Sequence, residues 1–132
     1  MEMIQLTKGI AYVVRGAKMK CNKGTNAKRI NLPISHGSYS NGNPIMNESD
    51  NVVGENISCF GICKGDCPST ENITLTKKNG KTITGKTCQV KILKEWMNTK
   101  EDTLVDGEPA LTTDSILICA YGGQIKFITD GQ

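Results

Sequence analysis

Four dipeptides that favour tight turns divide the chain into short segments, and they restrict the fold more than any other feature of the sequence. They are Asn41-Gly42, Asn79-Gly80, Asp106-Gly107 and Gly122-Gly123. Residue pairs of this kind adopt the positive φ angles that tight hairpin loops require. The residues on either side of Asn79-Gly80, 73–76 and 81–84, alternate apolar and polar side chains. This alternation predicts a two-stranded hairpin.

Further β-prone segments flank the other turns, and helical patterns are scarce. Residues 116–121 are apolar throughout, as in a strand buried on both faces, whereas residues 124–128 alternate. Residues 10–14 form another short β-prone run, and the one helix candidate, residues 93–97, is about one turn long. With 14 glycines and only 5% aromatic residues in 132, we predict a single all-β domain of short strands and hairpins with a lean core.

A weak internal repeat indicates symmetry within this domain. Residues 42–47 resemble residues 107–112, and each segment leads to a polar pair and then to a β-prone run and a cysteine, Cys59 or Cys119. A Gly-x-Pro turn that enters a strand is common, so chance is one explanation. Two copies that are followed by similar segments favour a duplicated β unit. A repeat without helices predicts sheets that are pseudo-symmetric about one axis.

Composition excludes several classes of protein. The net charge of +3 is too small to indicate a nucleic-acid-binding protein. The basic residues within 18–29 lack interleaved aromatic residues, which favours a solvated face. No apolar stretch is long enough to span a membrane, and the first residues lack the pattern of a signal peptide. We therefore expect synthesis in the cytoplasm, with export only by another route.

Six cysteines are the main chemical feature of the chain. They are Cys21, Cys59, Cys63, Cys67, Cys88 and Cys119. No Cys-x-x-Cys occurs, which disfavours a zinc ribbon. Metal binding by thiolates is the first interpretation, three disulfides are the second and buried inert thiols are the third.

Sequence offers little support for catalysis. A cysteine with His36, the single histidine, is the one available nucleophile–base pair, and His36 lies in a polar, turn-like stretch typical of a surface. No phosphate-binding loop and no recognisable pair of catalytic carboxylates occurs. We therefore expect a protein without enzymatic activity.

Residues 13–24, Val-Val-Arg-Gly-Ala-Lys-Met-Lys-Cys-Asn-Lys-Gly, are similar to the opening of the PAAR-like proteins, Gly-Ala-x-x-x-Cys-x-x-Gly. The resemblance continues at residues 60–63, at Cys88, and at residues 105–111, 115–125 and 131–132. Residues 115–125 are the most specific block, with the pattern Ser-x-Leu-x-Cys-x-x-Gly-Gly-x-Ile. The resemblance begins near Tyr12, so residues 1–11 are a possible additional segment of a single domain that covers 1–132.

The resemblance implies a small conical PAAR-like β fold that caps and sharpens the trimeric spike of a contractile injection system, such as type VI secretion or a phage-tail-like particle. Its partner would be a spike protein of the VgrG type, with one tip per trimer and effectors attached through the spike. The tip protein itself would contact a target membrane only by mechanical puncture and would bind no nucleic acid. It would be ejected together with the spike. The alternative is a free-standing binding module stabilised by metal or disulfides.

The resemblance also implies a structural metal near the apex, usually zinc. The four cysteines of the family pattern fall on Cys21, Cys63, Cys88 and Cys119, and Cys59 and Cys67 depart from it. We expect these two to be buried singly or, under oxidising conditions, joined to each other. A cone tapers until it buries too little apolar surface, and four thiolates at about 2.3 Å from one ion would cross-link its narrow end. We expect a flat, partly apolar face at the opposite end.

Overall fold

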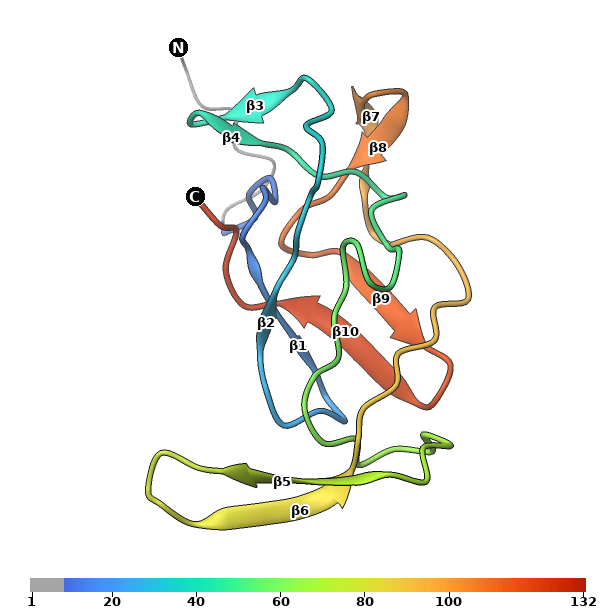
Figure 1. The fold of residues 1–132 in the computed structure, drawn as a ribbon. Helices are drawn as coiled ribbons and strands as arrows, with labels where there is room; N and C mark the ends of the chain where they lie inside the picture. The colour runs from blue at the N-terminus through green and yellow to red at the C-terminus, as the bar shows by residue number, and fades with distance from the viewer. Residues whose placement is uncertain (1–8) are drawn as a thin grey trace.

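Ten short strands form four antiparallel sheets in residues 9–132, the part of the chain that the computed structural model describes (Figure 1). The strands are β1 Lys18–Cys21, β2 Lys28–Arg29, β3 Tyr39–Ser40, β4 Asn43–Pro44, β5 Asn72–Thr76, β6 Thr82–Lys86, β7 Lys100–Val105, β8 Glu108–Ala110, β9 Ile116–Cys119 and β10 Gly123–Phe127. The predicted all-β class is confirmed. No helix occurs in the described range, and hence none that could cross a bilayer. Residues 93–97, the helix candidate, are irregular.

The largest sheet has four strands in the order β2-β1-β10-β9. Its pairs Met19↔Phe127 and Ile125↔Leu117 set the register. The side chains of Met19, Leu117 and Ile125 are fully buried and join one apolar core with Phe60. Burial of these side chains is the main source of stability for strands that are each only a few residues long.

The turn dipeptides occupy the loops that the sequence predicted. Asn41-Gly42 and Asp106-Gly107 join β3 to β4 and β7 to β8, and all four residues have positive φ. Asn79-Gly80 lies in the loop between β5 and β6, where Lys77 N–H bonds to Lys81 O at 2.7 Å and only Gly80 of the pair has positive φ. The five residues 77–81 therefore join the strands, and the Lys77–Lys81 bond encloses three of them, Lys78 in addition to the predicted pair.

Three short segments, residues 11–15, 44–48 and 109–113, bond to one another in a closed ring. We call them the threefold ring. Val13 N–H donates to Leu111 O, Leu111 N–H donates to Met46 O, and Met46 N–H donates to Val13 O, each at 3.0 Å. The three side chains are fully buried. Each segment thus receives one backbone bond from one neighbour and gives one to the other.

The equivalence of the three segments extends beyond these bonds. A second cycle of backbone bonds joins Arg15 N to Pro44 O, Glu48 N to Pro109 O and Thr113 N to Ala11 O. The same tight turn then follows each segment, from Ala17 N to Val14 O, Asp50 N to Asn47 O and Ser115 N to Thr112 O. A glycine at φ 84°, 78° or 82° precedes each segment, at Gly9, Gly42 and Gly107. The repeat inferred from two copies therefore has three in the structure.

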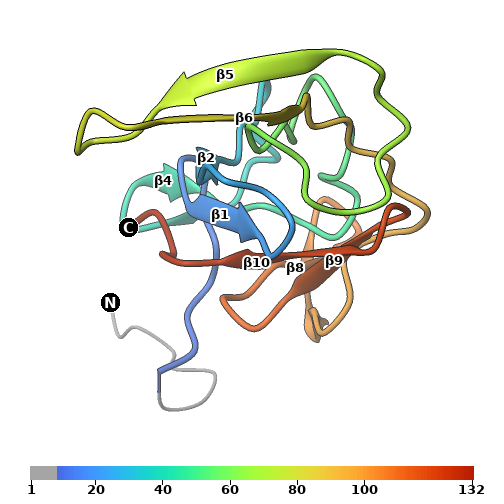
Figure 2. The same cartoon turned by 90° about the horizontal axis from the view of Figure 1, so that it is seen from below.

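The first and third copies continue alike, into the β1–β2 and β9–β10 hairpins, which pair within the large sheet. The second copy leads into irregular chain before the β5–β6 hairpin. Hairpins β3–β4 and β7–β8 lie at one end of the molecule, which we call the ring end (Figure 1). Hairpin β5–β6 lies at the other, the hairpin end, and Figure 2 shows it displaced to one side of the large sheet. Residues 1–8 of the predicted N-terminal segment lie outside the described residues.

Two leucines provide a matched test of this core. Leu117→Ala removes a fully buried side chain, so we expect the free energy of unfolding to fall by about 2–5 kcal/mol. Leu93→Ala makes the same chemical change at a side chain that is 64% exposed, and it should alter stability by less than about 0.5 kcal/mol. Urea denaturation followed by circular dichroism measures both values. Equal losses for the two variants would contradict this placement of the core.

Candidate functional site

The four cysteines predicted as ligands come from four separate segments that meet between the large sheet and the β5–β6 hairpin. Cys21 ends β1 and Cys119 ends β9. Cys63 precedes the hairpin and pairs with Gly24, whose N–H bonds to Cys21 O at 3.0 Å. Cys88 follows the hairpin. The sheet therefore positions two of the thiols, and the two chains at the base of the hairpin position the others.

Backbone bonds place Cys63 and Cys88 on neighbouring segments. Cys63 N–H donates to Lys86 O at 2.8 Å, and Cys88 N–H donates to Gly61 O at 2.9 Å. The bridge Ile62↔Thr87 lies between these bonds. Because the segments run antiparallel, residues before and after the hairpin are held side by side although they are distant in sequence.

The thiols affect one another's ionisation. Burial raises the pKa of Cys21 above its ordinary value, and the neighbouring thiols of Cys119 and Cys63 raise it further. Burial raises the pKa of Cys88 to about 12, with smaller contributions from Cys59, Cys63 and Cys21. Cys21 and Cys88 therefore retain their protons at neutral pH unless a cation stabilises the thiolates.

Backbone packs closely on two of these sulfur atoms. A Cβ atom at Gly123 would lie 2.6 Å from Cys21 Sγ, so this position in β10 accommodates only glycine without a shift of the thiol. Gly65 N–H donates to Cys63 Sγ at 3.4 Å. An N–H donor stabilises negative charge on sulfur and is a common feature around metal-bound thiolates.

The donor set has the chemistry of a structural zinc site, because it offers four thiols without a carboxylate. Within residues 9–132, however, no three Cys, His, Asp or Glu side chains lie in an arrangement that could hold a metal ion. The segments bring the predicted cysteines into one neighbourhood without closing their sulfur atoms around a common point. The ligand set Cys21, Cys63, Cys88 and Cys119 remains a prediction.

The two cysteines outside the family pattern differ from each other. Cys67 is buried, and its thiol donates to Thr87 O at 3.4 Å. Cys59 is exposed. All six cysteines are free thiols in the structure, so Cys59 and Cys67 are not joined to each other. Because Cys59 contributes to the raised pKa of Cys88, it lies nearer the cysteine cluster than its departure from the family pattern suggested.

His36 is at the ring end, in contact with two carboxylates. Its Nε2 lies 2.9 Å from Asp50 Oδ2, and its Nδ1 lies 3.4 Å from Asp106 Oδ2. The imidazole is only 18% exposed, so the sequence interpretation of a surface residue was incomplete. The residue ties the loop before β3 to the turn between β7 and β8, and sequence spacing gave no signal of these contacts.

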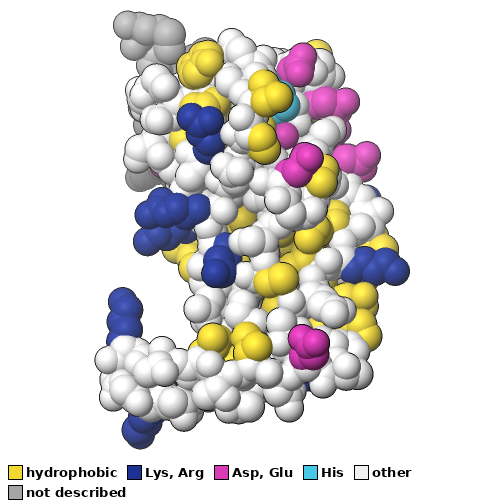
Figure 3. All heavy atoms as spheres, viewed as in Figure 1, with side chains coloured by type: hydrophobic (Ala, Val, Ile, Leu, Met, Phe, Trp, Pro, Cys, Tyr) yellow, Lys and Arg dark blue, Asp and Glu magenta, His cyan; other side chains and the backbone are white. Residues whose placement is uncertain are grey.

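Asp50 is the buried member of this group. Burial raises the pKa of its carboxyl above the ordinary value, and the hydrogen bonds from Asn47 N–H, at 2.7 Å, and from His36 oppose that rise. Figure 3 shows the histidine among several acidic side chains at this end of the molecule. No sequence motif marked Asp50 as a site residue.

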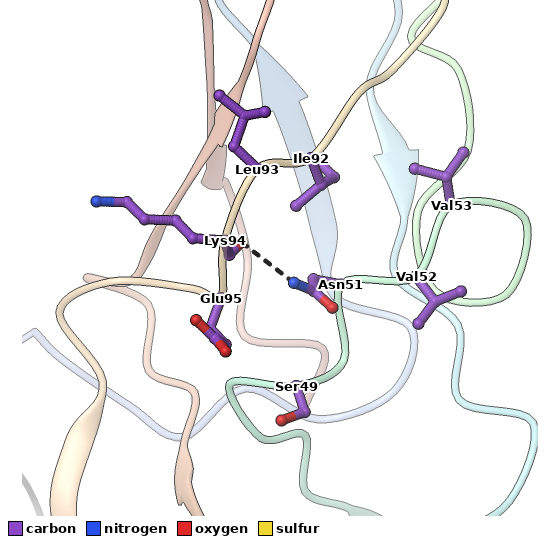
Figure 4. A pocket seen from close by; sticks show the side chains of 8 residues that line it. All are labelled: Ser49, Asn51, Val52, Val53, Ile92, Leu93, Lys94 and Glu95. Carbon is purple, nitrogen blue, oxygen red and sulfur yellow. Dashed lines mark hydrogen bonds between the residues drawn. The ribbon is translucent and has the colours of Figure 1, made fainter.

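A groove of about 450 Å³ lies on the side of the molecule, between residues 49–53 and 92–95 (Figure 4). Val52, Val53 and Leu93 line it with exposed apolar side chains, and Asn51 Nδ2 donates across it to Lys94 O at 3.1 Å. No thiol or imidazole lines this groove. The cysteine cluster is therefore the stronger candidate for chemistry.

Fold and site together define a small all-β protein with a threefold ring at one end and clustered thiols towards the other. The chain belongs to the family described as Domain of unknown function (DUF4280), which matches residues 13–132. Neither the curated proteins nor the solved structures give a significant match. The family description assigns no activity, so a proposal about function rests on the geometry described above.

The raised pKa of Asp50 predicts a specific dependence of stability on pH. A carboxyl whose pKa is higher in the folded state than in the unfolded state stabilises the fold when protonated, and this contribution is lost as pH rises through the folded pKa. Asp50→Asn keeps the size of the side chain and cannot ionise. We expect the unfolding free energy of the wild type, relative to Asp50→Asn, to decrease from about pH 3 to about pH 6. Urea denaturation across this range measures the difference, and an increase would contradict the prediction.

Proposed function

We propose that this chain is the non-enzymatic tip of a contractile injection system and caps a trimeric spike of the VgrG type through its ring end. The observation that carries the proposal is the threefold ring. A single chain that docks on three identical chains faces a symmetry mismatch, because each copy of the partner presents the same surface. Three equivalent segments within one chain remove that mismatch.

The surface around the ring end supports docking there. Ile34, Tyr39 and Leu104 are 81%, 56% and 61% exposed. Tyr39 lies in β3 and Leu104 in β7, both at the ring end in Figure 1, and the His36–Asp106 contact holds the loop of Ile34 beside the β7–β8 turn. Large apolar side chains that remain exposed on neighbouring segments are typical of a protein–protein interface.

The cysteine cluster supports a structural role away from the spike. Cys21, Cys63, Cys88 and Cys119 would hold a structural zinc ion, which would couple its binding free energy to folding and leave no coordination position for a substrate. A nucleophilic thiol needs a lowered pKa, so that the thiolate forms near neutral pH. The pKa values of Cys21 and Cys88 are instead raised. These features favour a mechanical part, synthesised in the cytoplasm and ejected with the spike, over an enzyme.

Co-expression with a trimeric spike protein of the VgrG type tests the docking proposal. We expect a complex of one chain per trimer by size-exclusion chromatography with light scattering. Leu104→Asp places a charge in the apolar surface of the ring end and should weaken the complex at least about tenfold. Leu93→Asp makes the same change on the side of the molecule and should leave the complex intact. Separate migration, or a ratio of three chains per trimer, would overturn the proposal.

Metal content tests the proposed zinc site. We expect about one zinc ion per chain after purification without chelators, measured by mass spectrometry of the metal. Cys21→Ser, Cys63→Ser, Cys88→Ser and Cys119→Ser should each abolish it and lower the melting temperature. Cys59→Ser and Cys67→Ser are the matched controls and should retain both. A metal-free wild type would refute the zinc site, and loss of zinc from either control would change the ligand set.

A further inference from the structure

The β5–β6 hairpin is an addition to the threefold repeat. It occurs once, between Cys63 and Cys88, and neither of the other two copies of the repeat contains an equivalent. Five residue pairs join its strands, from Asn72↔Lys86 to Thr76↔Thr82. In Figures 1 and 2 the turn between the strands projects past the rest of the molecule. A single appendage of this length is not needed to close the ring or the large sheet.

The two faces of the hairpin differ. On the outer face, the hydroxyls of Thr74 and Thr84 lie 2.7 Å apart across the strands. On the inner face, Leu75 pairs with Ile83, and both side chains are half-buried. Near the base, Ile62 packs against Gly85, where a Cβ atom would lie 2.6 Å from Ile62 Cγ2. The hairpin therefore presents an apolar face towards the body of the molecule.

A groove of about 1030 Å³ lies along this inner face. Its far side is formed by residues 24–27 and 62–65, and Leu75, Ile83 and Ile62 contribute apolar side chains to it. The groove is more than twice as large as the groove at residues 49–53. An extended segment of polypeptide fits such a space, because its alternate side chains point to opposite sides.

The charged side chains around the groove are all positive. Lys64, Lys77, Lys78 and Lys86 line it, and no Asp or Glu does. Lys86 Nζ is engaged by the carbonyl oxygens of Gly65, at 3.1 Å, and Cys67, at 2.9 Å. Lys64, Lys77 and Lys78 are exposed. Figure 3 shows basic side chains on the projecting hairpin and along the body, and most of the acidic side chains at the ring end, with an acidic side chain also beside the hairpin.

We propose that this groove binds an acidic, extended segment of a partner polypeptide. Carboxylates of the segment would pair with the exposed lysines, and its intervening apolar side chains would pack on Leu75 and Ile83. A flat membrane surface fits less well, because the apolar side chains face into the groove and the projecting turn carries only lysine, asparagine and glycine. The inference does not depend on the spike proposal, since it concerns the opposite end of the molecule.

Fluorescence anisotropy with the full chain tests this inference. The probe is a fluorescein-labelled peptide of about eight residues that alternates glutamate and valine, and the control peptide has lysine in place of glutamate. We expect saturable binding of the acidic peptide alone, weakened by added salt. The double variant Lys77→Glu/Lys78→Glu should weaken binding at least about tenfold, and Leu75→Ser should weaken it several-fold. The double variant Lys20→Glu/Lys126→Glu, at paired exposed positions of β1 and β10, makes the same change in net charge and should change binding less than about twofold.

Hydrogen exchange and vesicle binding test whether the groove itself is the binding site. Hydrogen exchange measured with the peptide bound should slow in residues 72–86, and melting temperatures will show that the variants remain folded. Absence of binding, or binding that Leu75→Ser and the lysine variants leave unchanged, would overturn the groove as a peptide site. Binding to vesicles of phosphatidylglycerol and phosphatidylcholine that depends on Lys77 and Lys78, without binding of the peptide, would overturn it in favour of a membrane surface.

Discussion

The closed cycle of backbone hydrogen bonds through Val13, Met46 and Leu111 is the constraint on which the rest of the structure depends. Each of the three segments is too short to be stable as part of an independent sheet. Joined in a ring, they satisfy one another's backbone groups and bury three apolar side chains in one core. The first and third segments of the ring lead directly into β1 and β9, so the ring also positions the start of these two strands of the large sheet.

The ring gives the molecule two chemically different ends. At the ring end, His36 holds two loops together through Asp50 and Asp106, among exposed apolar and acidic side chains. Towards the hairpin end, the thiols cluster and lysines line the groove beneath the β5–β6 hairpin. The two proposals above assign one of these ends to a trimeric partner and the other to an extended peptide.

Burial raises the pKa of Cys21 and of Cys88, and so favours the protonated form of these two thiols. A divalent cation would reverse that preference, since it stabilises several thiolates at once. The backbone packs closely against two sulfur atoms of the cluster. Gly65 N–H donates to Cys63 Sγ, and Gly123 lies against Cys21 Sγ.

Local sequence patterns predicted the turns and the alternation of residues 73–84, because φ preferences and side-chain polarity act over a few residues. They revealed two of the three repeats. The copy that begins at Gly9 shares the glycine with positive φ and the pattern of backbone bonds, but it lacks the proline of the Gly-x-Pro motif by which the other two copies were recognised. The contacts of His36 and the meeting of Cys21, Cys63, Cys88 and Cys119 join residues far apart in the chain. The sequence by itself determined an all-β chain of short hairpins, and only the tertiary structure decided the threefold ring and the neighbours of each thiol, because pairing between distant segments depends on how the whole core packs.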